Sequence, residues 1–445
     1  ERLGKLPLKK KENCATINVE GWCSMKAVIL AGGLGTRLKS VCENTPKPLI
    51  KLCEKPVLEH QINALKAEGI TEFILVLGHL SEQIKAYFGD GKKLGVSISY
   101  YVENQPLGTA GALFKLGLKE DFLLCNGDLI FNFSLPEMLS FHKEKNALAT
   151  LLTHPNNHPF DSTLFLTDGD VITGVLPKGN KPFSYANLCN AGIGIISPEL
   201  LKMYSFDGKA DLDKEVIAPA IKTGKIYSYK TFEYVKDMGT PDRLKAVEND
   251  IKSGIVSKMH KKCTQKAVFL DRDGTINIHK GYITKPCEIE LIDGVCEAIN
   301  KLHSLSFLVI IATNQPVIAR GECTIEELTE IHNRIETLLG ENGAFIDGIY
   351  YCPHHPDSGF PNEIKELKIK CDCRKPQPGL LFKAQKDFNI DLEKSYMVGD
   401  SLRDVEAGNN AGCTPVFLGK KTTEALPEKT PAFSSLKEFA ESLEN

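Results

Sequence analysis

Residues 266–275, KAVFLDRDGT, contain an apolar strand pattern that runs directly into two acidic residues. The strand is expected over Ala267 to Leu270, followed by Asp271 and Asp273, and Gly274 lets the chain turn. Side chains two residues apart beyond a strand end can point into the same crevice, where open α/β sheets bind ligands. One carboxylate can then attack phosphorus while the other moves a proton, if a cation holds the charge. The alternative interpretation is a surface turn that is simply rich in Asp and Gly.

A second stretch of the same kind lies near the start of the chain, where KAVIL, residues 26–30, runs into a glycine-rich turn. Strand and helix patterns alternate after each stretch, which is typical of parallel or mixed sheets with helices on both faces. The expected fold class is therefore α/β, with two Rossmann-like domains in series. The expected division is an unassigned N-terminal extension at 1–24, a first domain at 25–253, a linker at 254–265 and a second domain at 266–445.

Length and composition limit the classes of function. A chain of 445 residues has room for two or three domains, and 42% hydrophobic with 25% charged residues is ordinary for a globular protein. The net charge of −3 gives no reason to expect nucleic acid or an anionic membrane as a partner, and no apolar run reaches the roughly 18 residues of a membrane span. The basic first residues lack a following apolar segment, so we expect no secretory signal. We therefore expect a cytoplasmic protein, in which the 14 cysteines are reduced. The oligomeric state stays open.

The glycine-rich turn of the first unit, GGLGTR, would let backbone N–H groups approach phosphate oxygens closely. It has neither the GK[ST] of a Walker A loop nor GxGxxG spacing. Ten residues after Arg37, the sequence TPKPL places Lys47 between two prolines, which hold its charge in place. These motifs resemble the sugar-phosphate nucleotidyltransferase family. The resemblance implies a phosphate-binding loop of Gly32, Gly33, Gly35 and Thr36, with Arg37 and Lys47 as catalytic cations.

Later motifs extend this resemblance through the first domain. QPLGTAG, at 105–111, resembles the nucleobase-binding loop of the family, and CNAGI, at 189–193, resembles its sugar-binding strand. Lys181 competes with Lys178 as the sugar-phosphate lysine, because the Glu-Lys-Pro motif of the family is not intact here. Mg²⁺ and the fixed cations would lower the repulsion between a nucleoside triphosphate and a sugar 1-phosphate while pyrophosphate leaves. The implied site residues are Gln105, Gly108 and Thr109 for the nucleotide, Lys178 and Asn190 for the sugar phosphate, and Asp128 and Asp237 for Mg²⁺.

Three further motifs in the second domain carry partners for the two acids of DRDGT. They are IIATNQ with Thr313 and Asn314, RKP with Arg374 and Lys375, and GDS with Asp400. All four motifs in this order resemble the haloacid dehalogenase phosphatase superfamily, which implies a parallel sheet. The implied roles are an aspartyl-phosphate on Asp271, proton transfer by Asp273, phosphoryl binding by Thr313 and Lys375, and Mg²⁺ at Asp271, Asp400 and the Asp273 carbonyl. Asp404 would be a helix N-terminal acid or an outer neighbour of this site.

A loop before Lys375 contains CPHH and CDC, whose three thiols and imidazole suit tetrahedral Zn²⁺. Four protein ligands, Cys352, His354, Cys371 and Cys373, would make this zinc structural. The alternative is a set of unpaired, reduced cysteines. His355 is expected at the surface. The short spacing between Asp271 and Thr313 leaves no room for a large cap domain, so the zinc loop would stand over the active site in its place.

With CPHH and CDCRKPQPG, the second resemblance narrows to the heptose 1,7-bisphosphate and histidinol-phosphate phosphatase family. Two departures concern substrate selection. Pro316 and Val317 stand where the family commonly has Ser and Gly, and 18 residues separate Cys352 from Cys371. Arg320 and Arg374 are the side chains expected near the remaining charge of the substrate.

Together the two resemblances imply a bifunctional enzyme of nucleotide-sugar biosynthesis, a phosphatase joined to a nucleotidyltransferase. In the bacterial pathway to GDP-D-glycero-α-D-manno-heptose, used for lipopolysaccharide or other surface polysaccharide, a phosphatase removes the 7-phosphate of heptose 1,7-bisphosphate. A guanylyltransferase then activates the remaining 1-phosphate. The implied partners are a sugar bisphosphate, a sugar 1-phosphate and a nucleoside triphosphate, with GTP favoured by the pathway although no residue separates it from CTP, ATP or dTTP. The alternatives are histidinol phosphate with a mannose-like 1-phosphate, and a regulatory protein with one inactive domain.

Overall fold

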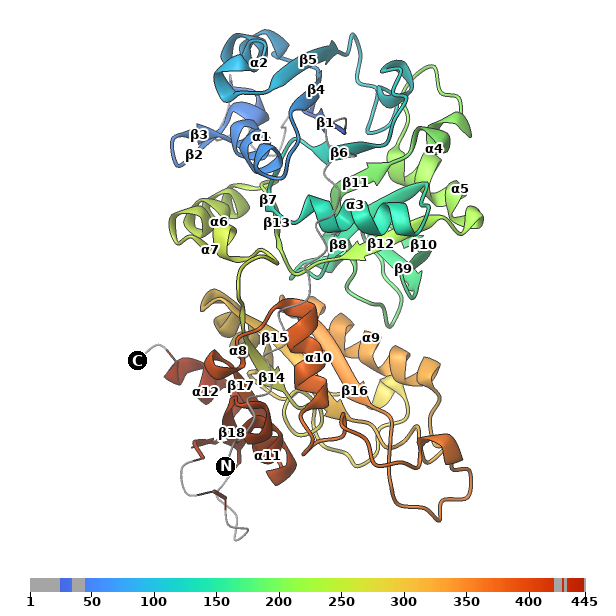
Figure 1. Cartoon of the computed structure of the whole chain (residues 1–445), viewed down its shortest axis with the longest axis vertical. Coiled ribbons are helices and arrows are strands. Elements are labelled where there is room, and N and C mark those ends of the chain that lie inside the picture. Colours follow the sequence, from blue (N-terminus) through green and yellow to red (C-terminus); the bar gives the residue numbers. More distant parts are fainter. Residues whose placement is uncertain (1–24, 34–44, 420–425, 428–429, 444–445) are drawn as a thin grey trace, which may run out of the picture.

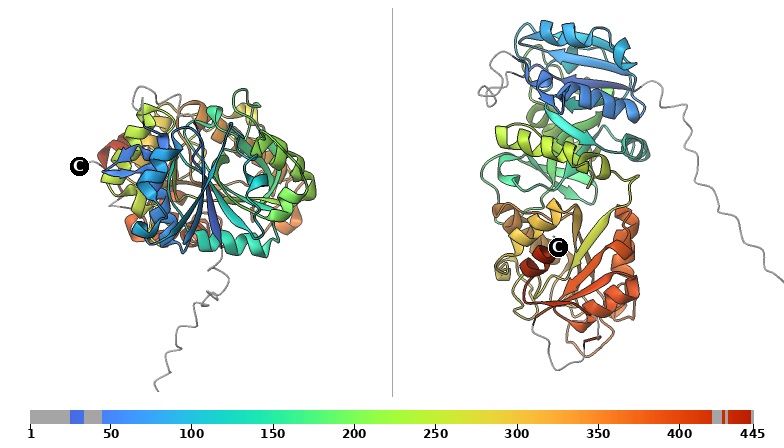
Figure 2. Two further views of the ribbon diagram at one scale, coloured as in Figure 1. Left: turned by 90° about the horizontal axis from the view of Figure 1, so that it is seen from above. Right: turned by 90° about the vertical axis from the view of Figure 1, so that its left-hand side faces the viewer.

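The computed structural model describes residues 25–33, 45–419, 426–427 and 430–443. The predicted N-terminal extension and the loop residues Gly35, Thr36 and Arg37 lie outside these ranges. Two α/β domains are stacked along the long axis of the molecule, with the first domain above the second in Figure 1. The side view of Figure 2 shows the same stacking. The prediction of two α/β units in series is therefore confirmed.

The first domain is built on a mixed sheet of nine strands in the order β5-β4-β1-β6-β11-β8-β12-β10-β9. Its strands are β1 (Lys26–Leu30), β4 (Glu72–Leu77), β5 (Ser97–Val102), β6 (Phe122–Asn126), β8 (Ala149–His154), β9 (Leu164–Asp168), β10 (Val171–Leu176), β11 (Cys189–Ile196) and β12 (Ile226–Lys230). β1 pairs in parallel with both β4 and β6. Ala27 and Ile29 pack into the core on one face of the sheet and Val28 into the core on the other, so the unbroken apolar run of KAVIL reflects burial on both faces.

Short strands and helices complete the first domain. Outside the main sheet, β2 (Lys51–Leu52) pairs with β3 (Lys55–Pro56), and β7 (Leu129–Asn132) pairs with β13 (Tyr234–Asp237). The helices up to the domain junction are α1 (Val57–Ala67), α2 (Ser81–Phe88), α3 (Leu135–Glu144), α4 (Pro198–Lys202), α5 (Ala218–Ala220), α6 (Pro241–Lys252) and α7 (Ile255–Lys258). The helix α2 begins after Leu80, which is in a left-handed conformation, and Ser81 is its first residue.

The second domain has a parallel sheet of six strands in the order β16-β15-β14-β17-β18-β19. The strands are β14 (Lys266–Leu270), β15 (Phe307–Asn314), β16 (Gly348–Cys352), β17 (Tyr396–Gly399), β18 (Thr414–Leu418) and β19 (Ala432–Phe433). The helices are α8 (Val295–Ser304), α9 (Ile325–Glu341), α10 (Gly379–Phe388), α11 (Leu402–Ala411) and α12 (Leu436–Ser442). Thr324 caps α9 and forms a capping box with Glu327. Within the described part of the chain, no helix is long and apolar enough to cross a bilayer.

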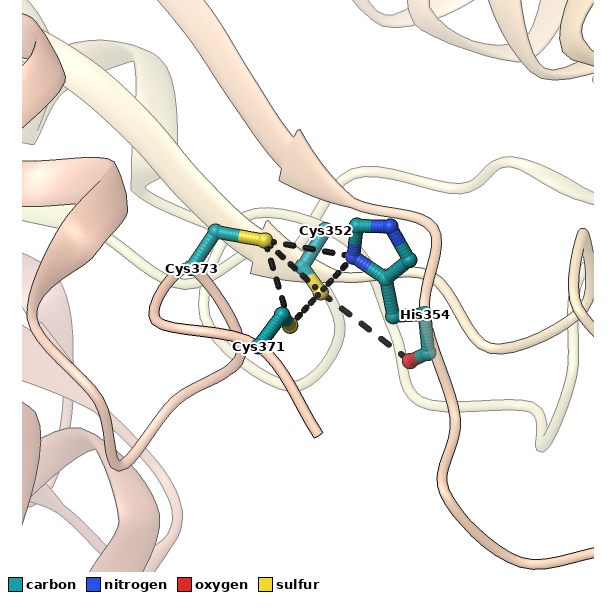
Figure 3. Close-up of side chains that lie close together, drawn as sticks. All are labelled: Cys352, His354, Cys371 and Cys373. Atoms are coloured by element: carbon teal, nitrogen blue, oxygen red, sulfur yellow. Dashed lines mark hydrogen bonds between the residues drawn. The ribbon is translucent and has the colours of Figure 1, made fainter. Parts of the chain in front are cut away.

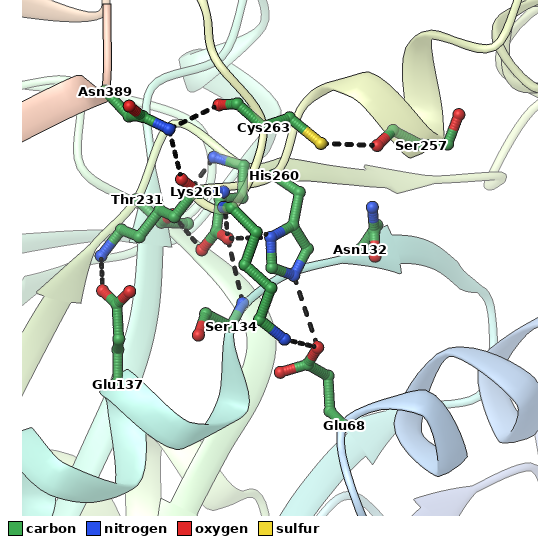
Figure 4. Close-up of polar contacts among 12 residues, drawn as sticks. Glu68, Asn132, Ser134, Glu137, Thr231, Ser257, His260, Lys261, Cys263 and Asn389 are labelled. Carbon is green, nitrogen blue, oxygen red and sulfur yellow. Dashed lines mark hydrogen bonds and ion pairs between the residues drawn. The ribbon is translucent and has the colours of Figure 1, made fainter. Parts of the chain in front are cut away.

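The predicted linker, 254–265, is anchored to both domains by polar contacts (Figure 4). His260 is buried there, with its ring nitrogens 3.5 Å from Glu68 and 3.7 Å from Glu233 of the first domain. Asn389 of the second domain donates two hydrogen bonds, of 3.0 and 3.1 Å, to backbone carbonyls of the segment. Because the segment also contains the helix α7, it is an ordered connection, which its sequence pattern did not indicate.

The second domain meets the first with the amino ends of its strands. Gln265, just before β14, forms a bridge with Ile390 at this edge. Close by, Phe232 of the first domain packs against Phe388, with ring centroids 5.2 Å apart. The carboxyl ends of β14 and β15 therefore lie at the opposite edge of the sheet, away from the first domain.

Candidate active sites

A buried lysine lies between two carboxylates at the carboxyl end of β14. Asp271 follows the strand, and its Oδ1 lies 2.9 Å from Nζ of Lys375. The same nitrogen lies 2.6 Å from Oδ1 of Asp404, in the first turn of α11. The side chains of Lys375 and Asp404 are 2% and 0% exposed, so both ion pairs are shielded from water.

Burial and charge shift the proton affinities of this group. Burial raises the pKa of Asp271 to about 6, with Lys375 opposing the rise and Asp404 adding to it. Burial alone would lower the pKa of Lys375, but the two carboxylates outweigh it and raise that pKa. Asp271 is therefore an ionised but unusually basic carboxylate at neutral pH, which suits a nucleophile.

Asp273 has the opposite electrostatic environment. Burial favours its neutral form, yet Arg272, Asn277 and Gln315 outweigh burial and lower its pKa. Nη2 of Arg272, a side chain only 1% exposed, lies 2.7 Å from Oδ2 of Asp273. The two acids of DRDGT thus have pKa values shifted in opposite directions, the pattern expected when neighbouring carboxyl groups take different roles.

Three carboxylates converge beside β14. Oxygens of Asp271, Asp400 and Asp404 lie within 4.8 Å of one another. Burial and the charge of Asp404 raise the pKa of Asp400. Gly274, with φ +83°, comes so close to Asp400 that any side chain at position 274 would overlap the carboxylate. Asp404 is fully buried, and Lys375 and Ser401 contact its two oxygens. The residues that fit Mg²⁺ are therefore Asp271 and Asp400, which are partly exposed.

The predicted phosphoryl-binding residues lie around this group. Thr313 is buried at the carboxyl end of β15, the neighbour of β14, and its hydroxyl accepts a 3.0 Å hydrogen bond from Gln315. The side chain of Asn314 forms two hydrogen bonds with the backbone of Lys375. It accepts one from the Lys375 N–H and donates one to the Lys375 carbonyl, each at 3.0 Å. The sequence prediction that Thr313, Asn314, Lys375 and Asp400 gather at the end of β14 agrees with this geometry.

Two arginines lie near the loop with the cysteines. The guanidinium of Arg320 lies between the rings of Tyr282 and Phe360, 4.1 and 4.3 Å from their centroids. Arg374 donates a 3.1 Å hydrogen bond to the carbonyl of His354. Stacking and hydrogen bonding fix the orientation of both planar cations, as anion recognition requires.

Cys352, His354, Cys371 and Cys373 form one cluster (Figure 3). Their Sγ and Nδ1 atoms lie 3.3 to 3.6 Å apart in the contacting pairs. Ligands around tetrahedral zinc lie roughly 3.8 Å apart, so the donor set and spacing fit Zn²⁺. A hydrogen bond with Cys352 lowers the pKa of Cys373 to about 5, which favours a thiolate. The prediction of His355 as a surface residue is wrong, because this side chain is 7% exposed and packs against Phe360 of the same loop.

In the first domain, a cleft of about 410 Å³ opens beside the carboxyl ends of β1 and β6. Gly108, with φ +76°, lies against the backbone of Ala210 with no room for a side chain. Gln105 is exposed next to Pro106, which lines the cleft. Glu103 also lines it, and burial raises the pKa of this carboxyl group. The predicted residues that line the cleft are Gly32, Gly33, Lys47, Gly108, Thr109 and Asp128.

The pairing of β7 with β13 brings the two predicted metal aspartates together. Asp237 stands opposite Leu129, the residue after Asp128. Each carboxylate contacts a cation: Nζ of Lys47 lies 2.5 Å from Asp128, and Nη1 of Arg243 donates to both oxygens of Asp237 at 3.0 and 3.1 Å. Aspartates at neighbouring positions of two paired strands are a donor set that fits a divalent cation, and the two side-chain cations balance their charge in the free protein.

The predicted sugar-phosphate residues gather around a third aspartate, outside the lining of the cleft. Nδ2 of Asn190 donates to Asp213 at 3.0 Å. Burial raises the pKa of Asp213, and the charge of Lys178, an exposed side chain, is one of the effects that oppose this rise. Nζ of Lys181 instead donates to three backbone carbonyls at 2.5 to 3.2 Å. The geometry therefore favours Lys178 over Lys181 as the sugar-phosphate lysine.

Sequence reasoning missed Arg272, Asp213 and Arg243. Arginine is rarely buried, so nothing in DRDGT signals that Arg272 neutralises Asp273 inside the protein. Arg243 reaches Asp161, 82 residues earlier, as well as Asp237. The contact with Asp161 leaves no local pattern, and the only local signal was the position of Arg243, six residues after Asp237.

One family model matches the first domain and another matches part of the second. The model described as nucleotidyl transferase matches residues 26–254, and the model described as HAD-hydrolase-like matches 372–443. The D-glycero-beta-D-manno-heptose-1,7-bisphosphate 7-phosphatase of Photorhabdus laumondii is 45% identical over 145 residues, which cover 33% of this chain and 75% of the relative. The protein of the same name from Escherichia coli K12 is 43% identical over 162 residues, which cover 36% of this chain and 83% of the relative.

Two solved structures align with the separate domains. HddC from Yersinia pseudotuberculosis is 25% identical, with coverage of 51% of this chain and 100% of that chain and a TM-score of 0.45. The D,D-heptose 1,7-bisphosphate phosphatase from B. bronchiseptica, complexed with magnesium and phosphate, is 35% identical, with coverage of 40% and 98% and a TM-score of 0.36. The first family model spans half of this chain, and the phosphatase relatives are matched over most of their own length. The chain therefore belongs to the nucleotidyl transferase family through its first domain and to the D-glycero-beta-D-manno-heptose-1,7-bisphosphate 7-phosphatase family through its second.

Proposed function

We propose that the protein carries out two consecutive steps of nucleotide-sugar synthesis. The second domain removes the 7-phosphate of D-glycero-D-manno-heptose 1,7-bisphosphate, and the first domain transfers GMP from GTP to the heptose 1-phosphate. The observation that carries the proposal is the buried group of Asp271, Lys375 and Asp404, in a domain whose relatives are named for this bisphosphate. Removing the 7-phosphate leaves a sugar 1-phosphate, the acceptor that a sugar-phosphate nucleotidyltransferase needs.

In the phosphatase reaction, Asp271 attacks phosphorus, the bond from phosphorus to the sugar oxygen breaks, and an aspartyl-phosphate forms. Asp273 protonates the leaving oxygen. Its pKa is low in the free protein, and the negative charge of a bound phosphate ester would raise it, which favours the protonated form that this step needs. Asp273 then takes a proton from the water that attacks the aspartyl-phosphate, which frees phosphate and restores Asp271.

Other residues of the second domain bind the substrate and balance its charge. Thr313 and Lys375 hold the phosphoryl oxygens. Asp271, Asp400 and the carbonyl of Asp273 would hold Mg²⁺, which supplies positive charge for the transferring group. Arg320 and Arg374 receive the phosphate that is not removed. The zinc cluster, through the carbonyl of His354, fixes Arg374 for that purpose.

In the transferase reaction, an oxygen of the sugar 1-phosphate attacks the α-phosphorus of GTP, and pyrophosphate leaves. Gly32 and Gly33 bind the triphosphate through backbone N–H groups, and Gln105, Gly108 and Thr109 contact the base. Asp128 and Asp237 would hold Mg²⁺, which lowers the repulsion between the two phosphates. Lys47 adds positive charge, while Lys178 and Asn190 orient the acceptor. We expect both reactions in the cytoplasm, where nucleoside triphosphates are made.

The experiment that tests this proposal compares substrates in each half-reaction with the full chain. Phosphate release is measured with Mg²⁺ for the two anomers of heptose 1,7-bisphosphate and for histidinol phosphate. The product is then incubated with GTP, CTP, ATP or dTTP and pyrophosphatase, and nucleotide sugars are identified by mass spectrometry. The proposal requires preference for the bisphosphate and a GDP-heptose mass. A preference for histidinol phosphate rejects the first step, and the absence of any nucleotide heptose rejects the second.

A further inference from the structure

The C-terminal half of α9, in the phosphatase domain, packs against residues 183–187 of the transferase domain. In Figure 1, α9 lies at the side of the lower domain that faces the upper one. The Tyr185 N–H donates to the hydroxyl of Thr337 at 2.9 Å, and the Asn187 N–H donates to the carboxylate of Glu336 at 2.8 Å. All four residues are less than 9% exposed. Both amides of the transferase domain thus depend on side chains of the phosphatase domain for their hydrogen bonds.

Two more contacts fix the exposed rim of this interface. Nη1 of Arg334 donates to the carbonyl of Phe183 at 2.8 Å, and the guanidinium lies 4.0 Å from the centre of the Phe183 ring. The hydroxyl of Ser184 donates to Glu330 at 2.6 Å. Four residues of one loop, at 183–185 and 187, therefore contact three consecutive turns of α9, so the helix holds the loop at several points.

The loop held by α9 carries the predicted acceptor residues at its two ends. It connects β10 to β11, with Lys178 just after β10 and Asn190 as the second residue of β11. Asn187 lies between them and continues the network, since its side chain donates to the Asn156 carbonyl at 2.6 Å and accepts from the Cys189 thiol at 3.3 Å. A displacement of 185–187 would therefore act on Asn190 through its neighbour Cys189, and Lys178 lies at the other end of the same loop.

A second route leads from the end of α9 to the predicted metal aspartate. Gly340 lies so close to Pro159 that an added Cβ would meet the proline ring at 2.5 Å. Pro159 begins the short helix that contains Asp161, which binds Arg243 at 2.7 Å, and Arg243 holds Asp237. Both routes start on one helix and end at residues assigned to the sugar 1-phosphate or to its metal ion.

We infer that α9 of the phosphatase domain positions the acceptor half of the transferase site, so that Thr337, Glu336 and Gly340 act as positioning residues for a reaction in the other domain. The nucleotide half, around Gly32, Gly108 and Thr109, receives no such support from α9 among the described contacts. Loss of the α9 contacts therefore weakens binding of the sugar 1-phosphate while binding of GTP persists. The inference rests on the proposed function only for the identity of the acceptor.

The chain offers a matched pair of variants on the same helix. Thr337 and Thr329 each donate a hydroxyl hydrogen bond to the carbonyl four residues earlier, at 2.8 and 2.9 Å. Only Thr337 also accepts from the transferase domain, and Thr329 is exposed. Thr337→Val removes the acceptor for the Tyr185 N–H, Thr329→Val removes only the local bond, and Thr337→Ser keeps the hydroxyl.

The measurement is the steady-state kinetics of both reactions in the full chain. We expect Thr337→Val to raise the KM for the sugar 1-phosphate about fivefold to tenfold, as for one buried donor left unpaired. The KM for GTP, the kcat of transfer and phosphate release should stay within about twofold of the wild type, as for distant sites. Thr329→Val should match the wild type in all these parameters, and Thr337→Ser should keep the wild-type KM for the sugar 1-phosphate.

Gly340→Ala tests the second route. The added methyl group pushes on Pro159 and should raise the Mg²⁺ concentration needed for transfer.

Equal acceptor KM values for Thr337→Val and Thr329→Val would overturn the inference. An equal loss of phosphatase activity and GTP binding would overturn it too, because the helix would then only support folding. If the wild type transfers no nucleotide to any sugar 1-phosphate, the proposed function fails. Hydrogen exchange of the Tyr185 and Asn187 amides then decides the role of α9 separately, and it must be faster in Thr337→Val than in Thr329→Val.

Discussion

The phosphatase centre and the transferase cleft both place a lysine against an aspartate, but in different surroundings. Lys375 and its partner Asp404 are 2% and 0% exposed, whereas Lys47 and Asp128 are 15% and 36% exposed. In the phosphatase domain the attacking group belongs to the protein, so it is fixed and shielded before substrate arrives. In the transferase domain both reacting groups arrive with the substrates, and the protein needs an open cleft with cations to align them. The difference follows from which molecule supplies the nucleophile.

Reciprocal substitutions give the largest expected effects. Asp271→Asn removes the nucleophile and should lower kcat of phosphate release by about 10⁴-fold or more, with the rate of nucleotidyl transfer unchanged.

Asp128→Asn should have the opposite effect. It should lower kcat of nucleotidyl transfer by about 10²-fold or more, with phosphate release unchanged, because it removes one carboxylate from a charge-neutralising metal site. Both activities are measured on each variant. A variant that loses both activities contradicts the separation of the two sites.

Removal of zinc should affect one domain strongly. Structural zinc sites bind with an apparent free energy on the order of 10 kcal/mol, so Cys371→Ser should lose the metal and lower the unfolding temperature of the phosphatase domain. Metal content by mass spectrometry and unfolding by calorimetry check this. Cys287→Ser, at an exposed and isolated cysteine, is the matched control. Equal zinc content in the two variants would reject the Cys₃His site.

Substitution of the two lysines tests the difference in burial between the phosphatase centre and the transferase cleft. Lys375→Met leaves Asp271 and Asp404 buried without a cation, which should lower the free energy of unfolding by about 3–5 kcal/mol. Lys47→Met breaks a partly exposed pair and should cost about 1 kcal/mol or less. Urea unfolding of both variants measures the difference. Similar losses in the two variants would show that the centres do not differ in hydration.

The smallest expected effect concerns pH. Burial raises the pKa of Glu336 above its ordinary value of 4.5, although Lys230 and the Asn187 N–H oppose the rise. Above about pH 4.5 the unfolded chain loses this proton before the folded protein does. The contribution of Glu336 to stability is therefore fully present below about pH 4.5 and is lost as the pH rises through the folded pKa. Glu336→Gln should remove this decline while keeping an acceptor for Asn187. Unfolding midpoints from about pH 5 to about pH 8 should differ in slope between the two proteins, and parallel curves would contradict the assignment.

Local sequence predicted the strand ends well and the contacts between distant segments poorly. KAVFLDRDGT and KAVIL lie in strands buried on both faces, and an acid or a glycine after such a strand necessarily reaches the carboxyl edge of the sheet. The zinc-type cluster was predictable because thiols at such spacing have few other uses. The support of residues 185–187 by α9 joins groups about 150 residues apart, and no periodicity encodes it. The ordered linker was missed for the same reason, since His260 is fixed by carboxylates from two remote elements.

The position of the second domain determines where its product is released. The carboxyl edge of β14 and β15 lies away from the transferase domain, and α9, with 17 residues, spans about 25 Å from that edge back to the junction. The heptose 1-phosphate must therefore leave into solvent and travel around the domain before it reaches the cleft. Covalent fusion in this geometry fixes the numbers of the two active sites at a ratio of one to one, while a competing enzyme can still capture the intermediate. An added trap for sugar 1-phosphates should lower the yield of nucleotide sugar as much for the fused protein as for an equimolar mixture of the Asp271→Asn and Asp128→Asn variants.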